Sequence, residues 1–77
     1  MPITVYTKPN CSQCVATKMI LDHAGVEYRT IDITEDSTAH RYITGDLGYS
    51  QAPVVVIDDN THWSGFRKDR LQNLTAA

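Results

Sequence analysis

The chain has 77 residues, with 7 Lys or Arg against 9 Asp or Glu and a formal net charge of −2. This length suffices for one small domain with a modest core and leaves no room for a second. The basic residues do not cluster as they do in nucleic-acid binders, so we expect no nucleic-acid partner. The longest aliphatic run, Val54–Ile57, is too short to cross a bilayer, and no secretory leader is evident. We expect one domain, residues 1–77, that is monomeric, cytoplasmic and free of membrane contact.

The first half of the sequence predicts a βαβ unit. Ile3–Thr7 alternates β-branched and aromatic residues, as strands do, and Pro9 ends it. A helical period begins at Ser12, and Gly25 is a suitable helix stop. The inward face of this helix is expected to hold Cys14, Thr17, Leu21 and Ala24. Glu27–Ile33 alternates again, so the two strands should lie parallel with a right-handed crossover.

A second helix is expected after an acidic stretch that includes Asp36, because carboxylates cap and stabilise helix N-termini. The helix should end near Gly45 or Gly48. Its apolar stripe consists of Ala39, Tyr42 and Ile43. This stripe predicts that one side of the helix packs against the sheet.

The remaining elements predict a β-hairpin and a short final helix. Val54–Ile57 and Thr61–Ser64 read as antiparallel strands around the turn Asp58–Asn60. Asp69–Leu74 reads as a helix, and Ala76–Ala77 should fray. Its inward residues are expected to be Leu71 and Leu74. The elements together predict an α/β fold in which three helices flank a four-stranded mixed sheet, in the order strand, helix, strand, helix, strand, strand, helix.

The two cysteines of the chain form a C-x-x-C motif, Cys11 and Cys14, at the start of the first helix. This spacing brings their Cα atoms within the ~4.4–6.8 Å that a disulfide requires. Helix N-termini and such motifs lower a cysteine pKa from about 8.5 to between about 3.5 and about 7.5. We expect Cys11 to be the nucleophile and Cys14 the resolving thiol, with Lys8 adding positive charge nearby.

A zinc-binding or interaction module, with chains paired through the cysteines, is the alternative of another class. Structural zinc uses the same C-x-x-C spacing but needs a second pair of ligands. The three histidines stand apart in the sequence: His23, His40 and His62. Their spacing does not match a zinc ligand pair, so we expect no metal and assign the histidines no role.

Two further segments invite a functional or a structural interpretation. The bond between Ala52 and Pro53 precedes the most apolar strand; it could be cis beside the dithiol, or Pro53 could simply start the strand in trans. The block Trp63–Arg67 places two aromatic residues around Ser-Gly. It could pack in the core, as aromatic residues commonly do, or form a docking rim beside the dithiol. Both pairs of alternatives remain open on these residues alone.

Three segments are similar to the NrdH-redoxin family within the thioredoxin/glutaredoxin superfamily, and the similarity covers nearly the whole chain. They are Val5-Tyr6-Thr7-Lys8-Pro9-Asn10-Cys11-Ser12-Gln13-Cys14, Ala52-Pro53-Val54-Val55 and Trp63-Ser64-Gly65-Phe66-Arg67. The resemblance implies a thioredoxin-like fold with Pro53 in cis and no resident cofactor. It also implies a protein-disulfide reductase that carries electrons from an NADPH-dependent thioredoxin reductase to a class Ib ribonucleotide reductase.

The resemblance also suggests roles around the dithiol. The expected supporting residues are Lys8, Gln13 and Pro53. The expected partner-docking residues are Ser12, Ala52, Trp63, Ser64, Gly65, Phe66 and Arg67.

A glutathione-dependent glutaredoxin is the alternative with the same chemistry. Phe66 stands where glutaredoxins typically have the second glycine of their glutathione site, so we expect poor use of glutathione.

Two positions depart from the family pattern. Ser12 replaces an apolar residue, and Lys68 stands where a proline is common.

Overall fold

The computed structural model describes residues 3–75 and shows one four-stranded sheet in the order β2-β1-β3-β4. The strands are β1 (Ile3–Thr7), β2 (Tyr28–Asp32), β3 (Val54–Asp58) and β4 (Thr61–Ser64). β1 runs parallel to β2 and antiparallel to β3, and β3 and β4 form an antiparallel hairpin. The mixed sheet, the parallel pair and the hairpin expected from the sequence are confirmed.

Three α-helices and one π-helical segment accompany these strands within the described residues. They are α1 (Ser12–His23), α2 (Ser37–Arg41), η1 (Tyr42–Asp46) and α3 (Lys68–Thr75). Asp36 caps α2 by accepting a hydrogen bond from the Ala39 amide at 3.0 Å, as its place in the sequence predicts. Gly25 has a φ of +69° just after α1, a left-handed conformation that favours glycine at a helix end.

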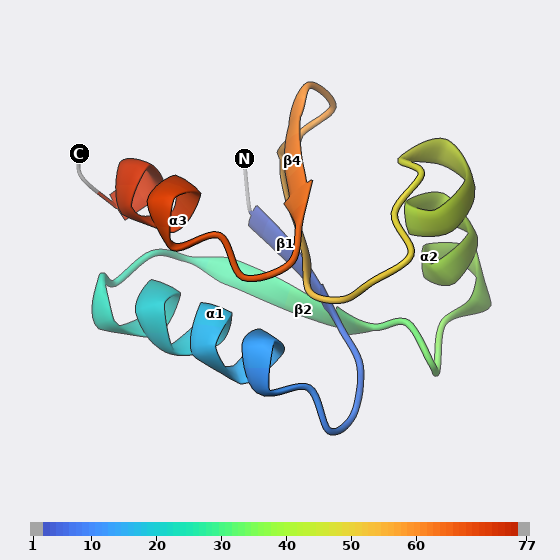
Figure 1. The fold of residues 1–77 in the computed structure, drawn as a ribbon, viewed down its shortest axis with the longest axis horizontal. Helices are drawn as coiled ribbons and strands as arrows, with labels where there is room; N and C mark the ends of the chain where they lie inside the picture. Colours follow the sequence, from blue (N-terminus) through green and yellow to red (C-terminus); the bar gives the residue numbers. More distant parts are fainter. Residues whose placement is uncertain (1–2, 76–77) are drawn as a thin grey trace.

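The helices cover both faces of the sheet (Figure 1). α1 and α3 lie side by side on one face, where the apolar cluster consists of Ile3, Val5, Leu21, Val55, Trp63 and Leu71. α2 and η1 lie on the other face, over Tyr6, Ala39, Ile43 and Val54. Neighbouring residues of β1 and β3 thus point to opposite faces, because side chains alternate along a strand.

Several predicted boundaries need correction. β2 is shorter than Glu27–Ile33, and β3 extends one residue further, to Asp58, where the hairpin register shifts. The second helix changes to π-helical geometry at Tyr42, which no local pattern indicated. α3 begins at Lys68, one residue before the predicted start.

Ala24 is exposed as the C-cap of α1 and does not join the inward face. The expected fraying of Ala76 and Ala77 lies outside the described residues. No helix within residues 3–75 combines the length and the apolar character needed to span a bilayer.

Candidate functional site

The two cysteines meet at the N-terminus of α1 and form a disulfide, with Cα atoms 5.2 Å apart. Asn10 takes a positive φ of 59° in the preceding turn, and Cys11 then has extended geometry as the N-cap of the helix. The Cys11 sulfur accepts a hydrogen bond from the Cys14 amide at 3.1 Å. Cys11 is partly exposed, whereas Cys14 is only 1% exposed. One sulfur is therefore accessible to a partner, and the other is held in the interior.

Two surface hollows meet at Cys11. One, of about 280 Å³, is lined by Lys8, Asn10, Cys11, Ser12, Gln13, Gln51 and Ala52. The other, of about 620 Å³, is lined by Lys8, Pro9, Asn10, Cys11, Ser12, Cys14, Val15 and Lys18. Lys8 and Ser12 are exposed, and both line each hollow.

The peptide bond between Ala52 and Pro53 is cis. Ala52 lines the smaller hollow together with Cys11, and Pro53, the residue before β3, is buried. The structure thus decides between the two forms that the sequence left open.

The block 63–67 is attached to this same region by hydrogen bonds from residues far apart in the sequence. The Gly65 amide donates to the Pro53 carbonyl at 2.8 Å, where Gly65 has a φ of +86°. The Phe66 amide donates to the Gln13 side-chain oxygen at 3.3 Å. Gln13, between the two cysteines, therefore links the dithiol turn to the loop before α3.

Residues of the block differ strongly in exposure. Trp63 is buried at 5% exposure and belongs to the core cluster, whereas Phe66 is 36% exposed. Ser64 donates its hydroxyl to the Gln51 carbonyl at 2.7 Å. The core interpretation therefore holds for Trp63, whereas Phe66 and Arg67 lie on the surface.

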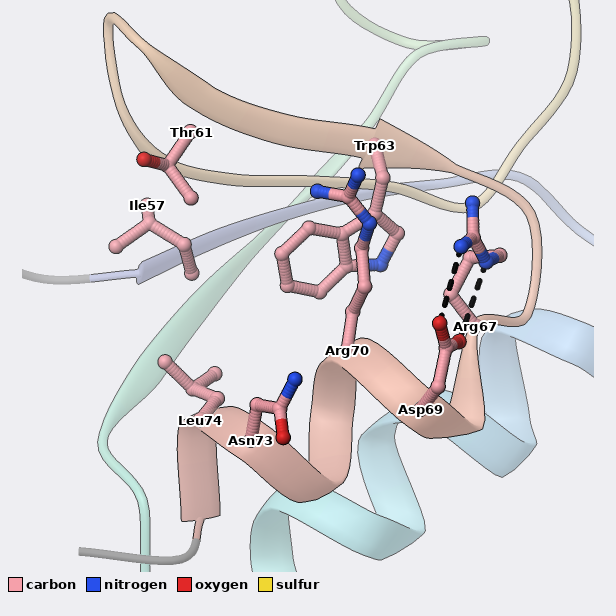
Figure 2. Close-up of a pocket in the computed structure, with 8 residues that line it drawn as sticks. All are labelled: Ile57, Thr61, Trp63, Arg67, Asp69, Arg70, Asn73 and Leu74. Atoms are coloured by element: carbon pink, nitrogen blue, oxygen red, sulfur yellow. Dashed lines mark hydrogen bonds and ion pairs between the residues drawn. The ribbon is translucent and has the colours of Figure 1, made fainter.

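Side chains of β3, β4, the end of the block and α3 line a pocket of about 500 Å³ between β4 and α3 (Figure 2). Arg67 makes two hydrogen bonds to Asp69, at 3.2 and 3.0 Å, on the rim of this pocket. These bonds hold the pKa of the Asp69 carboxyl below its usual range. Arg70 extends across the Trp63 ring, with its guanidinium carbon 5.6 Å from the ring centre.

Within residues 3–75, no three His, Cys, Asp or Glu side chains gather in a way that could hold a metal ion. His62 instead pairs with Tyr49, whose hydroxyl lies 2.7 Å from the ring nitrogen Nδ1. Neither this pair nor the position of Gln51 had a signal in the sequence, because both depend on contacts between distant segments.

Comparison with known proteins agrees with this geometry. A model of the glutaredoxin family matches residues 3–63. The glutaredoxin-like protein NrdH of Escherichia coli is 36% identical over 77 residues, which are 100% of this chain and 93% of that protein. The chain belongs to the NrdH-redoxins of the glutaredoxin family.

Further similarities extend over most of the chain. The gene 56 protein of a Mycobacterium phage is 38% identical over 73 residues, covering 95% of this chain and 81% of that protein. The solved structure of NrdH-redoxin from Escherichia coli has a TM-score of 0.88, with 96% of this chain and 95% of that chain covered at 36% identity. The thioredoxin-like fold and the redox-active cysteine pair of this glutaredoxin-like protein are thus established.

Proposed function

We propose that this protein is a dithiol–disulfide electron carrier, reduced by an NADPH-dependent thioredoxin reductase and reoxidised by a protein disulfide of a class Ib ribonucleotide reductase. The observation that carries the proposal is the asymmetry of the cysteine pair. Cys11 is accessible and accepts a backbone hydrogen bond, whereas Cys14 is buried beside it. A cytoplasmic location suits this role, because the reducing cytoplasm lets a cysteine pair cycle.

In the reduced protein, the Cys11 thiolate attacks one sulfur of the partner disulfide. A bond forms between Cys11 and that sulfur, and the second partner sulfur leaves as a thiolate that takes up a proton. Cys14 then loses its proton and attacks the Cys11 sulfur, which closes the internal disulfide and releases the first partner sulfur as a thiol. Two electrons have passed to the partner, and the reductase dithiol returns two electrons to the carrier.

The surrounding residues support these steps in distinct ways. The amide of Cys14 donates to the Cys11 sulfur, an interaction that stabilises negative charge there. Lys8 contributes a positive charge on the rim of both hollows. Gln51 and Ala52 line the smaller hollow together with Cys11, and we infer that a partner segment lies in this hollow.

We assign docking to Ser12 and Ala52 beside the sulfur and to the block 63–67 at the other end of the site. Phe66 and Arg67 present the exposed surface of this block, while Trp63 supports it from the core. The hydrogen bond from the Phe66 amide to the Gln13 side chain holds the block in position relative to the dithiol.

Two observations favour a thioredoxin reductase over glutathione as the electron source. The Escherichia coli relative is described as having a thioredoxin-like activity profile. In this chain the Phe66 amide is already engaged by Gln13, and the Phe66 side chain occupies the adjacent surface. A small peptide thiol thus finds neither a free amide nor an open backbone at this position.

A coupled assay tests the proposal by following NADPH consumption with a disulfide substrate under two reducing systems. We expect turnover with thioredoxin reductase that requires this protein, and little turnover with glutathione and glutathione reductase. Efficient turnover only with glutathione would replace the proposal by a glutathione-dependent glutaredoxin.

Mass spectrometry of the native protein provides an independent control. Loss of two hydrogens on oxidation supports the carrier, whereas retained zinc that blocks oxidation of the cysteines would contradict it.

A further inference from the structure

The pocket between β4 and α3 contains a buried hydrogen-bond donor with no partner. Trp63 is 5% exposed, and among the described residues its indole Nε1 is the one buried side-chain N or O atom without a hydrogen-bond partner. Figure 2 shows this nitrogen on the side of the ring that faces α3. Leaving a buried donor unpaired destabilises a fold, and a partner from outside the chain that pairs with this donor would remove that cost.

Arg70 supplies an uncompensated positive charge at the same place. Its guanidinium lies over the Trp63 ring, and no carboxylate of residues 3–75 pairs with it. The neighbouring Arg67 is different, because Asp69 already neutralises it through two hydrogen bonds. Arg70 is therefore the cation of this pocket that remains available for an incoming anion.

The rest of the pocket selects among anions. Thr61 and Asn73 add neutral polar groups, whereas Ile57 and Leu74 add apolar surface at the end away from Arg67 (Figure 2). The pocket thus pairs a cation and an indole donor with an apolar wall. A carboxylate carried next to an aliphatic group matches this combination, and a fully hydrated inorganic anion does not.

We propose that this pocket binds an acidic side chain of a partner protein, flanked by an aliphatic residue. The carboxylate accepts one hydrogen bond from the Arg70 guanidinium and one from the indole, after a local movement of side chains gives access to Nε1. Replacing the contact between Arg70 and the Trp63 ring by these hydrogen bonds is favourable, because a charge-assisted hydrogen bond is stronger than an exposed cation–π contact. The site adjoins the docking block through Trp63 and Arg67, but its binding does not depend on the proposed redox function.

The experiment uses the oxidised protein with no reductase present, so it can fail or succeed independently of electron transfer. Trp63 is the single tryptophan of the chain, and its indole N–H therefore gives one assignable peak in a ¹⁵N–¹H correlation spectrum. The probe is acetyl-Leu-Glu-Leu-amide, and its matched control is acetyl-Leu-Gln-Leu-amide. Sodium phosphate is the free-anion probe.

We expect the glutamate peptide to shift the indole peak downfield in a saturable way and the glutamine peptide to leave it in place. Arg70→Gln should weaken binding about tenfold or more, as expected for loss of a charge-assisted hydrogen bond. Lys68→Gln, which removes an equal charge outside the pocket, should change binding less than about twofold.

Four results would overturn the proposal. The indole peak could stay in place at millimolar glutamate peptide, or the shift could be equal for both peptides. Binding could also survive Arg70→Gln unchanged. A response to phosphate as strong as that to the glutamate peptide would identify a general anion pocket and overturn the peptide assignment.

Discussion

The two faces of the sheet are built differently, and the chemistry lies on the more extensively packed one. The face under α1 and α3 combines aliphatic side chains from both helices with the buried Trp63 ring. The face under α2 and η1 has a smaller buried cluster, with the tilted ring pair of Tyr6 and Tyr42 at 5.9 Å. Burial raises the pKa of the Tyr6 hydroxyl.

The difference teaches how a small domain keeps a reactive sulfur in position. Leu21, at 0% exposure, anchors the same helix whose first turn carries the dithiol. α1 is therefore held by the larger core, and the amide that faces Cys11 is held with it. The opposite face stabilises the sheet but contributes no side chain to either hollow at the dithiol.

The largest expected effect is on disulfide reduction, and it differs between substitutions of the two cysteines. Cys11→Ser should abolish reduction of protein disulfides, because the nucleophile is lost, while Cys14→Ser should trap a mixed disulfide with the partner. Gel electrophoresis without reductant, followed by mass spectrometry, detects the trapped species. Full turnover by the Cys14→Ser variant would show that the two roles are wrongly assigned.

A matched pair of core substitutions then compares the two faces directly. Leu21→Ala and Ile43→Ala each remove a fully buried aliphatic side chain and should each lower the free energy of unfolding by about 2–5 kcal/mol. Denaturant unfolding measures this loss.

Only Leu21→Ala should also lower turnover per folded molecule, because it loosens the helix that carries the cysteines. Equal losses of turnover in both variants, measured where each is folded, would contradict the comparison.

A smaller effect is expected at the link between the dithiol turn and the docking block. Gln13→Ala removes the acceptor for the Phe66 amide and should cost about 0.5–1.5 kcal/mol in stability, with a few-fold loss of turnover. Thr44→Ala is the matched control, because it removes a 2.8 Å hydrogen bond to the His40 carbonyl on the other face. An equal loss of turnover in the control would remove the special role of Gln13.

The smallest expected effect is a loss of folding stability at alkaline pH. Burial, together with a 2.7 Å hydrogen bond to Asp22, raises the pKa of Tyr28 to about 12 from 10.0. The folded protein holds this proton more tightly, so its contribution to stability is complete below pH 10 and decreases as pH rises toward 12. Urea unfolding at several pH values should show the decrease, and Tyr28→Phe should flatten it. An unchanged slope in the variant would assign the decrease to other groups.

The sequence was sufficient to predict every strand, the three α-helices, the parallel first pair and the position of the cysteines at a helix start. These features depend on short-range signals. The alternation in Ile3–Thr7, the helical period after Ser12 and the cap at Asp36 each act within a few residues. The difference in exposure between Cys11 and Cys14 also has a local cause, because an N-cap residue faces outward and the third residue of a helix turns inward.

Contacts between distant segments determined the rest. The π-helical segment and the bridge from Gln13 to Phe66 had no signal in the local sequence, and the bond before Pro53, which the residues alone left open, is cis as the family resemblance implies. The pairing of Trp63 with Arg70 likewise requires β4 and α3 to meet. A linear pattern reports the preferences of one segment, whereas these features arise from the free energy of two segments in contact, and so they become visible once the chain has folded.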